Sequence, residues 1–211
     1  MLNVDQSRVS QGGVVLLADI VGIASPAQAP NVIRFPAPMT ALFAAQFRAS
    51  FPGGKPKEQG GTIVADAVGN LSIQRLGGLG SNAGEFDFDM RPTNAAKYKA
   101  IGMFHTHPYG KADHWAVGVP LSGGDCAALT DNQYVISAVQ SGPHLFVCLK
   151  TAQSPKWVDQ SGLQKAGNAD VAQRMRAGQS LEVASQAVCR KIAGLLALAF
   201  YQGANGVVTR L

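Results

Sequence analysis

The apolar run at residues 100–104 (AIGMF) is followed at once by the sequence HTHP. A short apolar run of this kind predicts a buried strand. Pro108 ends the strand because proline has no amide hydrogen to give to a neighbouring strand. The chain is therefore expected to be organised around a buried strand that carries two histidines at its end.

His105 and His107 are predicted to form one part of a metal site. Alternate residues of a strand point to the same face, about 6.7 Å apart, so both imidazoles can reach one ion. Further along, Ser122-Gly-Gly-Asp125 is typical of a loop that enters a helix, with Ser122 as N-cap and Asp125 in the first turn. The helix N-terminus keeps that carboxylate ionised, as a metal ligand must be. His105, His107 and Asp125 thus predict a Zn²⁺ site with a fourth position left for water.

Each half of this pattern also has a simpler interpretation. Ser-x-x-Asp is close to the capping box that begins many helices, and many His-x-His pairs bind no metal. The two halves together, in this order and on these elements, favour the metal site. Asp113 and His114 are weaker candidate ligands, because neither has a partner at strand or helix spacing.

A hydrolytic site also needs a general base, and Glu58 is the first candidate. It precedes Gly60-Gly61 and a predicted strand, and the two glycines allow the backbone to approach closely. Glu85 is the competitor, in the alternating segment EFDFDM. That alternation is typical of a half-exposed strand with its acids in water, so Glu58 is favoured.

Taken together, Glu58-x-Gly-Gly, His105-x-His107-Pro and Ser122-x-x-Asp125 resemble the JAMM motif of the catalytic MPN+ (JAB) metalloprotease family. The resemblance covers about residues 38–150. It implies that zinc is bound by His105, His107 and Asp125. In the mechanism it implies, Glu58 activates the zinc-bound water and Ser122 helps to hold the tetrahedral intermediate. The chain is thus expected to be a zinc metallopeptidase or isopeptidase that cleaves an amide bond of a protein or peptide substrate.

The sequence departs from the family pattern in the long link, residues 109–121, between the histidine pair and Ser122. Loops tolerate insertion at small thermodynamic cost, so the departure bears on the substrate more than on the metal. Tyr109, Trp115 and Val117 in this link are expected either to form a lid or substrate wall, or to belong to an ordinary surface loop.

Two other functions stay open. Some MPN relatives are scaffolds, so a non-catalytic binding module is one alternative. The complete set of base and ligands speaks against it, because a scaffold has no need of both. Similar JAB-type domains occur in bacterial polymorphic toxins, so a secreted bacterial effector is the other alternative.

The composition, with 46% hydrophobic and 15% charged residues and a net charge of +5, is that of a compact enzyme-like protein. Lysines and arginines are scattered, so no nucleic-acid partner is expected. No apolar stretch is long enough to span a membrane, so no membrane partner is expected either. Cys126, Cys148 and Cys189 form no CxxC pattern and are expected to be reduced.

Residues 14–29 imitate a secretory signal, with an apolar run and an A-x-A site. Asp19 interrupts the run, and Arg8 before it is offset by Asp5. Residues 13–24 are instead predicted to form a strand of the sheet. A cytoplasmic location is expected, with export by a signal-independent secretion system left open.

Strands interleaved with helices predict a mixed α+β (α/β) fold in which helices flank a mixed sheet, and the family resemblance specifies an MPN/JAB-like sheet with an additional C-terminal helix. One domain in three segments is expected: an N-terminal strand and extended stretch (1–37), a metallohydrolase core (38–151) and a C-terminal helical extension (152–211). The core is predicted to hold helices at 39–50 and 123–130, and strands at 61–66, 70–76, 85–90, 134–139 and 145–149 besides the histidine strand.

The C-terminal extension is expected to be irregular over 152–166, then helical near 168–178 and over 181–202. Apolar residues of the last helix recur at helical spacing, among them Leu181, Val188, Ile192 and Leu196. That face is expected to pack on the core, or to form a homodimer contact if it is exposed.

Overall fold

A computed structural model describes residues 13–77, 91–109 and 117–211. The strands are β1 (Val32–Arg34), β2 (Gly60–Ala65), β3 (Leu71–Gly77), β4 (Lys99–Thr106), β5 (Ile136–Ser141), β6 (His144–Leu149), β7 (Ala199–Ala204) and β8 (Val207–Arg210). They form one sheet in the order β1-β8-β7-β6-β5-β4-β2-β3, with β4 and β5 parallel and the other neighbours antiparallel. The helices are α1 (Leu17–Ile20), α2 (Ala37–Ala49), α3 (Gly123–Asp131), α4 (Gln160–Arg176) and α5 (Leu181–Leu195). The predicted mixed α+β class is confirmed.

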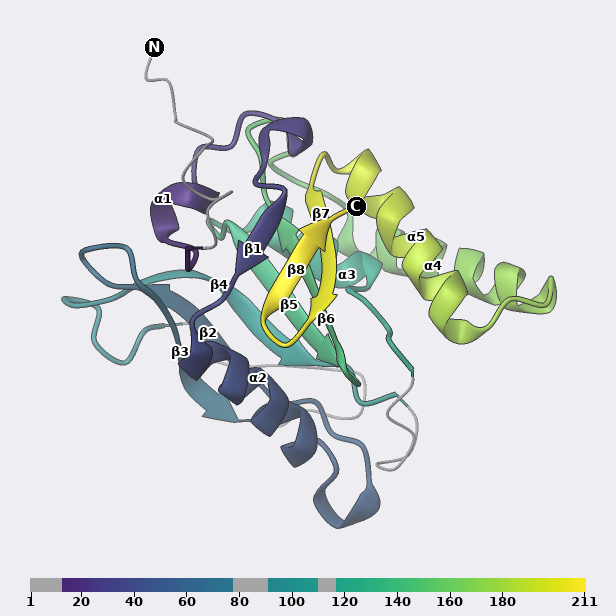
Figure 1. The fold of residues 1–211 in the computed structure, drawn as a ribbon. Helices are drawn as coiled ribbons and strands as arrows, with labels where there is room; N and C mark the ends of the chain where they lie inside the picture. Colours follow the sequence, from purple (N-terminus) through teal and green to yellow (C-terminus); the bar gives the residue numbers. More distant parts are fainter. Residues whose placement is uncertain (1–12, 78–90, 110–116) are drawn as a thin grey trace.

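Helices cover both faces of the sheet, which curls between them (Figure 1). A hydrophobic core lies on each face of the sheet, and the side chains of the central strand β6 alternate between the two cores. Leu145 and Val147 pack with α1 and α2 on one face, whereas Phe146 and Cys148 pack with α3 and α5 on the other. Full burial of such a side chain stabilises the fold by about 1.5 to 3 kcal/mol.

A β-bulge in β4 sets the direction in which the histidines point. In the pairing with β2, Gly102 lies opposite Ile63 and Ala100 opposite Val64, so Ile101 is an extra residue. Beyond the bulge, Phe104 faces α2, where its ring lies 4.7 Å from that of Phe43. Side chains alternate between the two faces along a strand, so the next side chain, that of His105, points to the opposite face, toward α3.

The predicted elements of the core are confirmed wherever the structure describes them. The helix expected at 39–50 is α2, the hairpin expected at 61–76 is β2 and β3, and the helix expected at 123–130 is α3. The strands expected at 134–139 and 145–149 are β5 and β6, joined at Gly142. The strand expected at 85–90 lies outside the described residues.

The prediction of a strand over residues 13–24 is wrong. The segment contacts the sheet through a single bridge between Leu16 and Asn70 and a hydrogen bond from Val15 N to Arg34 O, and then forms α1. The Asp19 carboxylate causes this turn, because it accepts a 2.8 Å hydrogen bond from Leu16 N and so satisfies a donor at the helix start. The edge strand of the sheet is instead β1, within the proline-rich stretch that was expected to be only an extended connection.

The prediction for the C-terminal segment is wrong at two places. Residues 160–166 are helical, because the Asp159 side chain caps α4 by accepting from Gly162 N at 3.0 Å. The last helix ends at Leu195, and residues 199–210 form the hairpin of β7 and β8. Asn205 and Gly206, with φ of 51° and 74°, make the two-residue turn that this hairpin requires. The C-terminus therefore adds two strands to the sheet besides its helices.

The apolar face of α5 is covered within the chain. Ala184, Val188, Ile192 and Ala193 are buried in the core that α5 shares with α3 and the sheet. This is the packing alternative expected for the last helix. Among the described residues, no helix has both the length and the apolar character needed to cross a membrane.

Candidate metal centre

His105 and His107 lie together at the end of β4, on the face that α3 covers. Both residues are buried, with 2% and 4% of their surface exposed. Their Nε2 atoms are 3.1 Å apart, and the rings meet edge to face. The two nitrogens therefore point at one small volume, as the alternation of the strand predicts.

Asp125 reaches the same volume from the first turn of α3. Ser122 is the N-cap, and the two residues form a capping box: Asp125 N donates to Ser122 Oγ at 3.2 Å, and Ser122 N donates to Asp125 Oδ2 at 2.7 Å. Asp125 Oδ1 lies 3.3 Å from His105 Nε2, and its Oδ2 lies 3.6 Å from His107 Nε2. The Ser-x-x-Asp pattern is thus a capping box, as its simpler interpretation predicts. The Asp125 carboxylate also faces both histidines.

The spacing of these atoms suits a metal ion. Ligands bound at about 2.0 to 2.2 Å in a tetrahedral arrangement are separated from one another by about 3.3 Å, close to the three distances in this cluster. In the part of the chain that the structure describes, this is the one group of three or more His, Cys, Asp or Glu side chains whose ligand atoms all lie within 4.8 Å of each other. His105, His107 and Asp125 can therefore hold a metal ion.

The Asp125 carboxylate is kept in the form that binds a metal. Burial raises its pKa, but the charges of the two adjacent imidazoles and the hydrogen bond with His105 outweigh the burial. The pKa of Asp125 is consequently held well below its ordinary value. An ionised carboxylate is the ligand form, so no proton must leave this side chain when a cation binds.

Glu58 lies on the same face of the sheet as the two histidines. The pairing of β2 and β4 continues beyond Gly60, because Thr106 N donates to Gln59 O at 2.8 Å. Gln59 N donates to the Thr106 side chain, at 2.9 Å from Oγ1. The next pair in that register is Glu58 and His107. Cross-strand partners share a face, so the Glu58 side chain is directed toward the metal-binding group.

Burial changes the acidity of Glu58. The residue is 4% exposed. Desolvation raises its pKa from 4.5 to about 7, the neighbouring His107 opposes the rise, and Asp125 adds to it. A carboxyl group with a pKa near neutrality can both accept and deliver a proton at physiological pH.

The raised pKa predicts a pH-dependent stability for the metal-free protein. The folded chain binds the Glu58 proton more tightly than the unfolded chain, so this residue lowers the free energy of unfolding as the pH rises from 4.5 to about 7. Glu58→Gln should therefore become more stable than the wild type, by up to roughly 3 kcal/mol above pH 7. Urea denaturation of both proteins in chelator at pH 5 and pH 8 measures this. The prediction would be contradicted if the free energies of unfolding of the variant and the wild type differed by the same amount at both pH values.

Several residues that hold this site were not found from the sequence. Val119 O lies 3.2 Å from His107 Nδ1, the Ser50 and Thr106 hydroxyls are 2.6 Å apart, and Gln164 Oε1 of α4 accepts from Gly124 N at 2.7 Å. Each contact joins residues far apart in the chain. The N-cap pattern predicts α3, but no local signal predicts that α4 supports its first turn.

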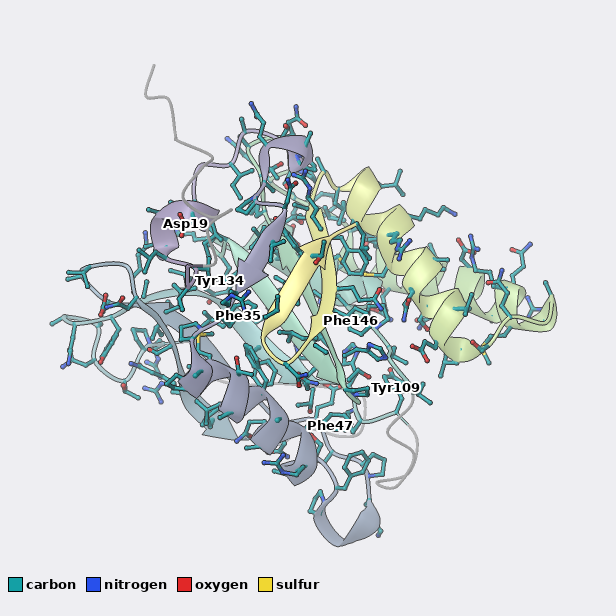
Figure 2. All side chains as sticks on the ribbon, viewed as in Figure 1. Asp19, Phe35, Phe47, Tyr109, Tyr134 and Phe146 are labelled. Atoms are coloured by element: carbon teal, nitrogen blue, oxygen red, sulfur yellow. The ribbon has the colours of Figure 1, made fainter. Side chains whose placement is uncertain are left out.

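Tyr109 forms the exposed rim of the site. Its ring stands edge to face with His107 at 5.6 Å, and 41% of its surface is exposed. Burial first, then the carboxylates of Glu58 and Asp125, raise the pKa of its hydroxyl. Figure 2 shows Tyr109 and Phe47 at one end of the sheet and Asp19 at the other. Tyr109, the first residue of the 109–121 link, therefore lies beside the metal-binding group.

The remaining candidates divide into two groups. Glu85, Asp113, His114 and Trp115 lie outside the described residues, so the competing base, the alternative ligands and part of the expected lid have no described position. His144, a histidine outside the metal-binding group, is partly exposed, and its Nε2 lies 3.5 Å from Glu182 Oε1.

Comparison with known proteins adds no relative to this picture. No family model, no curated protein and no solved structure matches the chain. The site therefore has to be interpreted from its own geometry.

Proposed function

We propose that the protein is a zinc-dependent hydrolase of the JAMM type, with an MPN/JAB-like fold, which cleaves a peptide or isopeptide bond. One observation carries the proposal: a metal-binding group of two histidines and an aspartate has a buried carboxylate, Glu58, beside it on the same face of the sheet. A site that only stores or binds a metal does not need that fourth group. Its burial is costly, which is typical of a residue kept for chemistry.

The group of His105, His107 and Asp125 supplies the zinc ligands in this proposal. Two imidazoles and one carboxylate are a usual ligand set for catalytic zinc, which acts as a Lewis acid toward water and the substrate carbonyl when bound. Glu58 accepts a proton from the attacking water and delivers it to the leaving amine. Its pKa of about 7 suits both transfers, because the proton is neither too weakly nor too strongly held.

Ser122 is proposed to donate a hydrogen bond to the developing oxyanion. Its Oγ already accepts from Asp125 N at 3.2 Å, which fixes the side chain at the mouth of α3. An oxygen that accepts this bond still has its own hydrogen to donate. A preorganised donor of this kind contributes about 3 kcal/mol to catalysis.

The proposed substrate is a protein or peptide, which passes Tyr109 on its way to the site. The half-exposed phenol presents a flat apolar ring with a hydrogen-bonding end, a combination suited to an amide backbone. The three buried free thiols are compatible with a cytoplasmic location.

The test combines metal analysis with hydrolysis. The purified protein is expected to contain about one equivalent of zinc, to cleave at least one member of a panel of peptide, isopeptide and small amide substrates, and to lose that activity in chelator and regain it with added zinc. Activity that survives complete removal of the metal would contradict the proposal. A full complement of zinc without hydrolysis of any substrate would favour the non-catalytic binding module.

A further inference from the structure

We propose that Ser141 is a positioning residue, which holds the backbone of residues 117–119 against His107 and thereby selects the tautomer in which His107 can bind a metal. The inference rests on the metal site of the proposed function. It adds a residue from β5 that belongs to neither the ligand set nor the proton-transfer machinery.

The Ser141 hydroxyl joins the end of the histidine strand to the segment that precedes α3. Its Oγ is fully buried and accepts a hydrogen bond from Val119 N at 3.1 Å. The same oxygen lies 2.9 Å from His107 O and 3.1 Å from Val117 O, either of which can accept its hydrogen. The Ser141 side chain thus holds the backbone of His107 and the backbone of residues 117–119 next to each other.

The loop fixed by Ser141 determines the chemistry of the His107 ring. Val119 O lies 3.2 Å from His107 Nδ1. A carbonyl oxygen can only accept, so this bond forms only when Nδ1 carries the hydrogen. The lone pair of Nε2 is then free to face His105 and Asp125, which is the form that a metal requires.

The loop is also contacted from its outer side, by α5. Gln186 Nε2 of α5 lies 3.5 Å from Gly118 O. A side chain at position 118 would begin 2.6 Å from the ring of His144 and 3.1 Å from Glu182 Oε1. The segment 117–119 therefore lies between α5 on its outer side and Ser141 on its inner side. Loss of the hydrogen bonds to Ser141 removes the contact that sets how close this segment lies to His107.

The first experiment needs no substitution. In the metal-free wild type at alkaline pH, ¹⁵N NMR of the imidazoles should show His107 as the Nδ1–H tautomer, because Nδ1 lies within hydrogen-bonding distance of Val119 O at 3.2 Å, whereas the competing Asp125 Oδ2 lies 3.6 Å from Nε2. Observation of the Nε2–H tautomer as the main form would overturn the inference, whether or not any variant folds.

The second experiment compares two serines of one strand. Ser141→Ala should increase the Nε2–H population of His107 and weaken zinc binding by about 10- to 100-fold in a chelator competition. Ser137→Ala is the matched control, since Ser137 is equally buried on the same face of β5 but its hydroxyl has no hydrogen-bond partner among the described residues. Its zinc affinity should stay within about two-fold of the wild type. Equal affinities of the two variants would overturn the inference.

A conservative variant separates positioning from packing. Ser141→Thr retains the hydroxyl and should retain the wild-type tautomer, whereas a role in packing alone would make it no better than Ser141→Ala. None of these measurements depends on hydrolysis. If the protein binds zinc in a Ser141-dependent way but cleaves no substrate, the inference stands and the proposed hydrolase function fails.

Discussion

Glu58→Gln should lower kcat by about 10²- to 10⁴-fold while the protein keeps its zinc, because the substitution removes the proton acceptor and none of the three ligands. Glutamine has nearly the same shape as glutamate and is neutral, so it also avoids the cost of a buried charge. Steady-state kinetics and zinc analysis of the same preparation measure the two effects. The combination of lost activity and retained metal distinguishes a base from a ligand.

A surface carboxylate provides the control for this substitution. Asp170→Asn makes the same chemical change on α4, where Asp170 pairs with Arg174 and Lys191 at 2.8 Å, away from the metal centre. Its kcat should be unchanged. A Glu58→Gln protein with the activity of the Asp170→Asn protein would exclude Glu58 from the mechanism, and one without zinc would make it part of the binding site.

Gly102→Ala should destabilise the protein by at least about 3 kcal/mol, which for a chain of this length corresponds to a fall in Tm of about 6 to 12 °C. A Cβ at this position would lie 2.0 Å from the carbonyl oxygen of Ile136 and 2.5 Å from its Cγ2. The carbonyl belongs to the parallel partner strand β5, so it cannot move without breaking the pairing. Calorimetry or thermal circular dichroism measures the fall.

The same substitution in α5 is the matched control. A Cβ at Gly194 would meet no atom within 4 Å, and alanine is favoured over glycine inside a helix by about 1 kcal/mol. Gly194→Ala should therefore leave Tm unchanged or raise it. If Gly102→Ala melts within about 2 °C of Gly194→Ala, the close approach of β4 and β5 does not contribute to stability as inferred.

The parts of the site that follow from local rules were predictable from the sequence. The position of His105 and His107 on one face follows from strand alternation, and the position of Asp125 follows from the Ser122 cap. Both rules involve residues at most three apart. The convergence of the two pieces could be inferred only from the chemistry they share, and the structure brings the three side chains together.

The errors arose where contacts between distant residues decide the outcome. Residues 196–202 continue the helical pattern of α5, yet the chain turns at Ala197, with φ of 49°, and enters a strand that pairs with β6. The Asn205-Gly206 turn was the available signal for a hairpin there. The support of α3 by Gln164 and the acceptor for His107 depend on how separate elements pack, and no pattern within either element encodes them.

The hairpin of β7 and β8 links the two ends of the chain and so affects the order of folding. The edge strand β1 obtains its hydrogen bonds from β8, and Arg210 donates to the carbonyls of Pro26 and Ala27 across more than 180 positions of sequence. Translation runs from the N-terminus, so β8 is made long after β1, and β1 has no β8 to pair with until then. Until β8 is made, the backbone groups of β1 and β7 that pair with it lack their partner, and unpaired strand edges of this kind can pair with other chains.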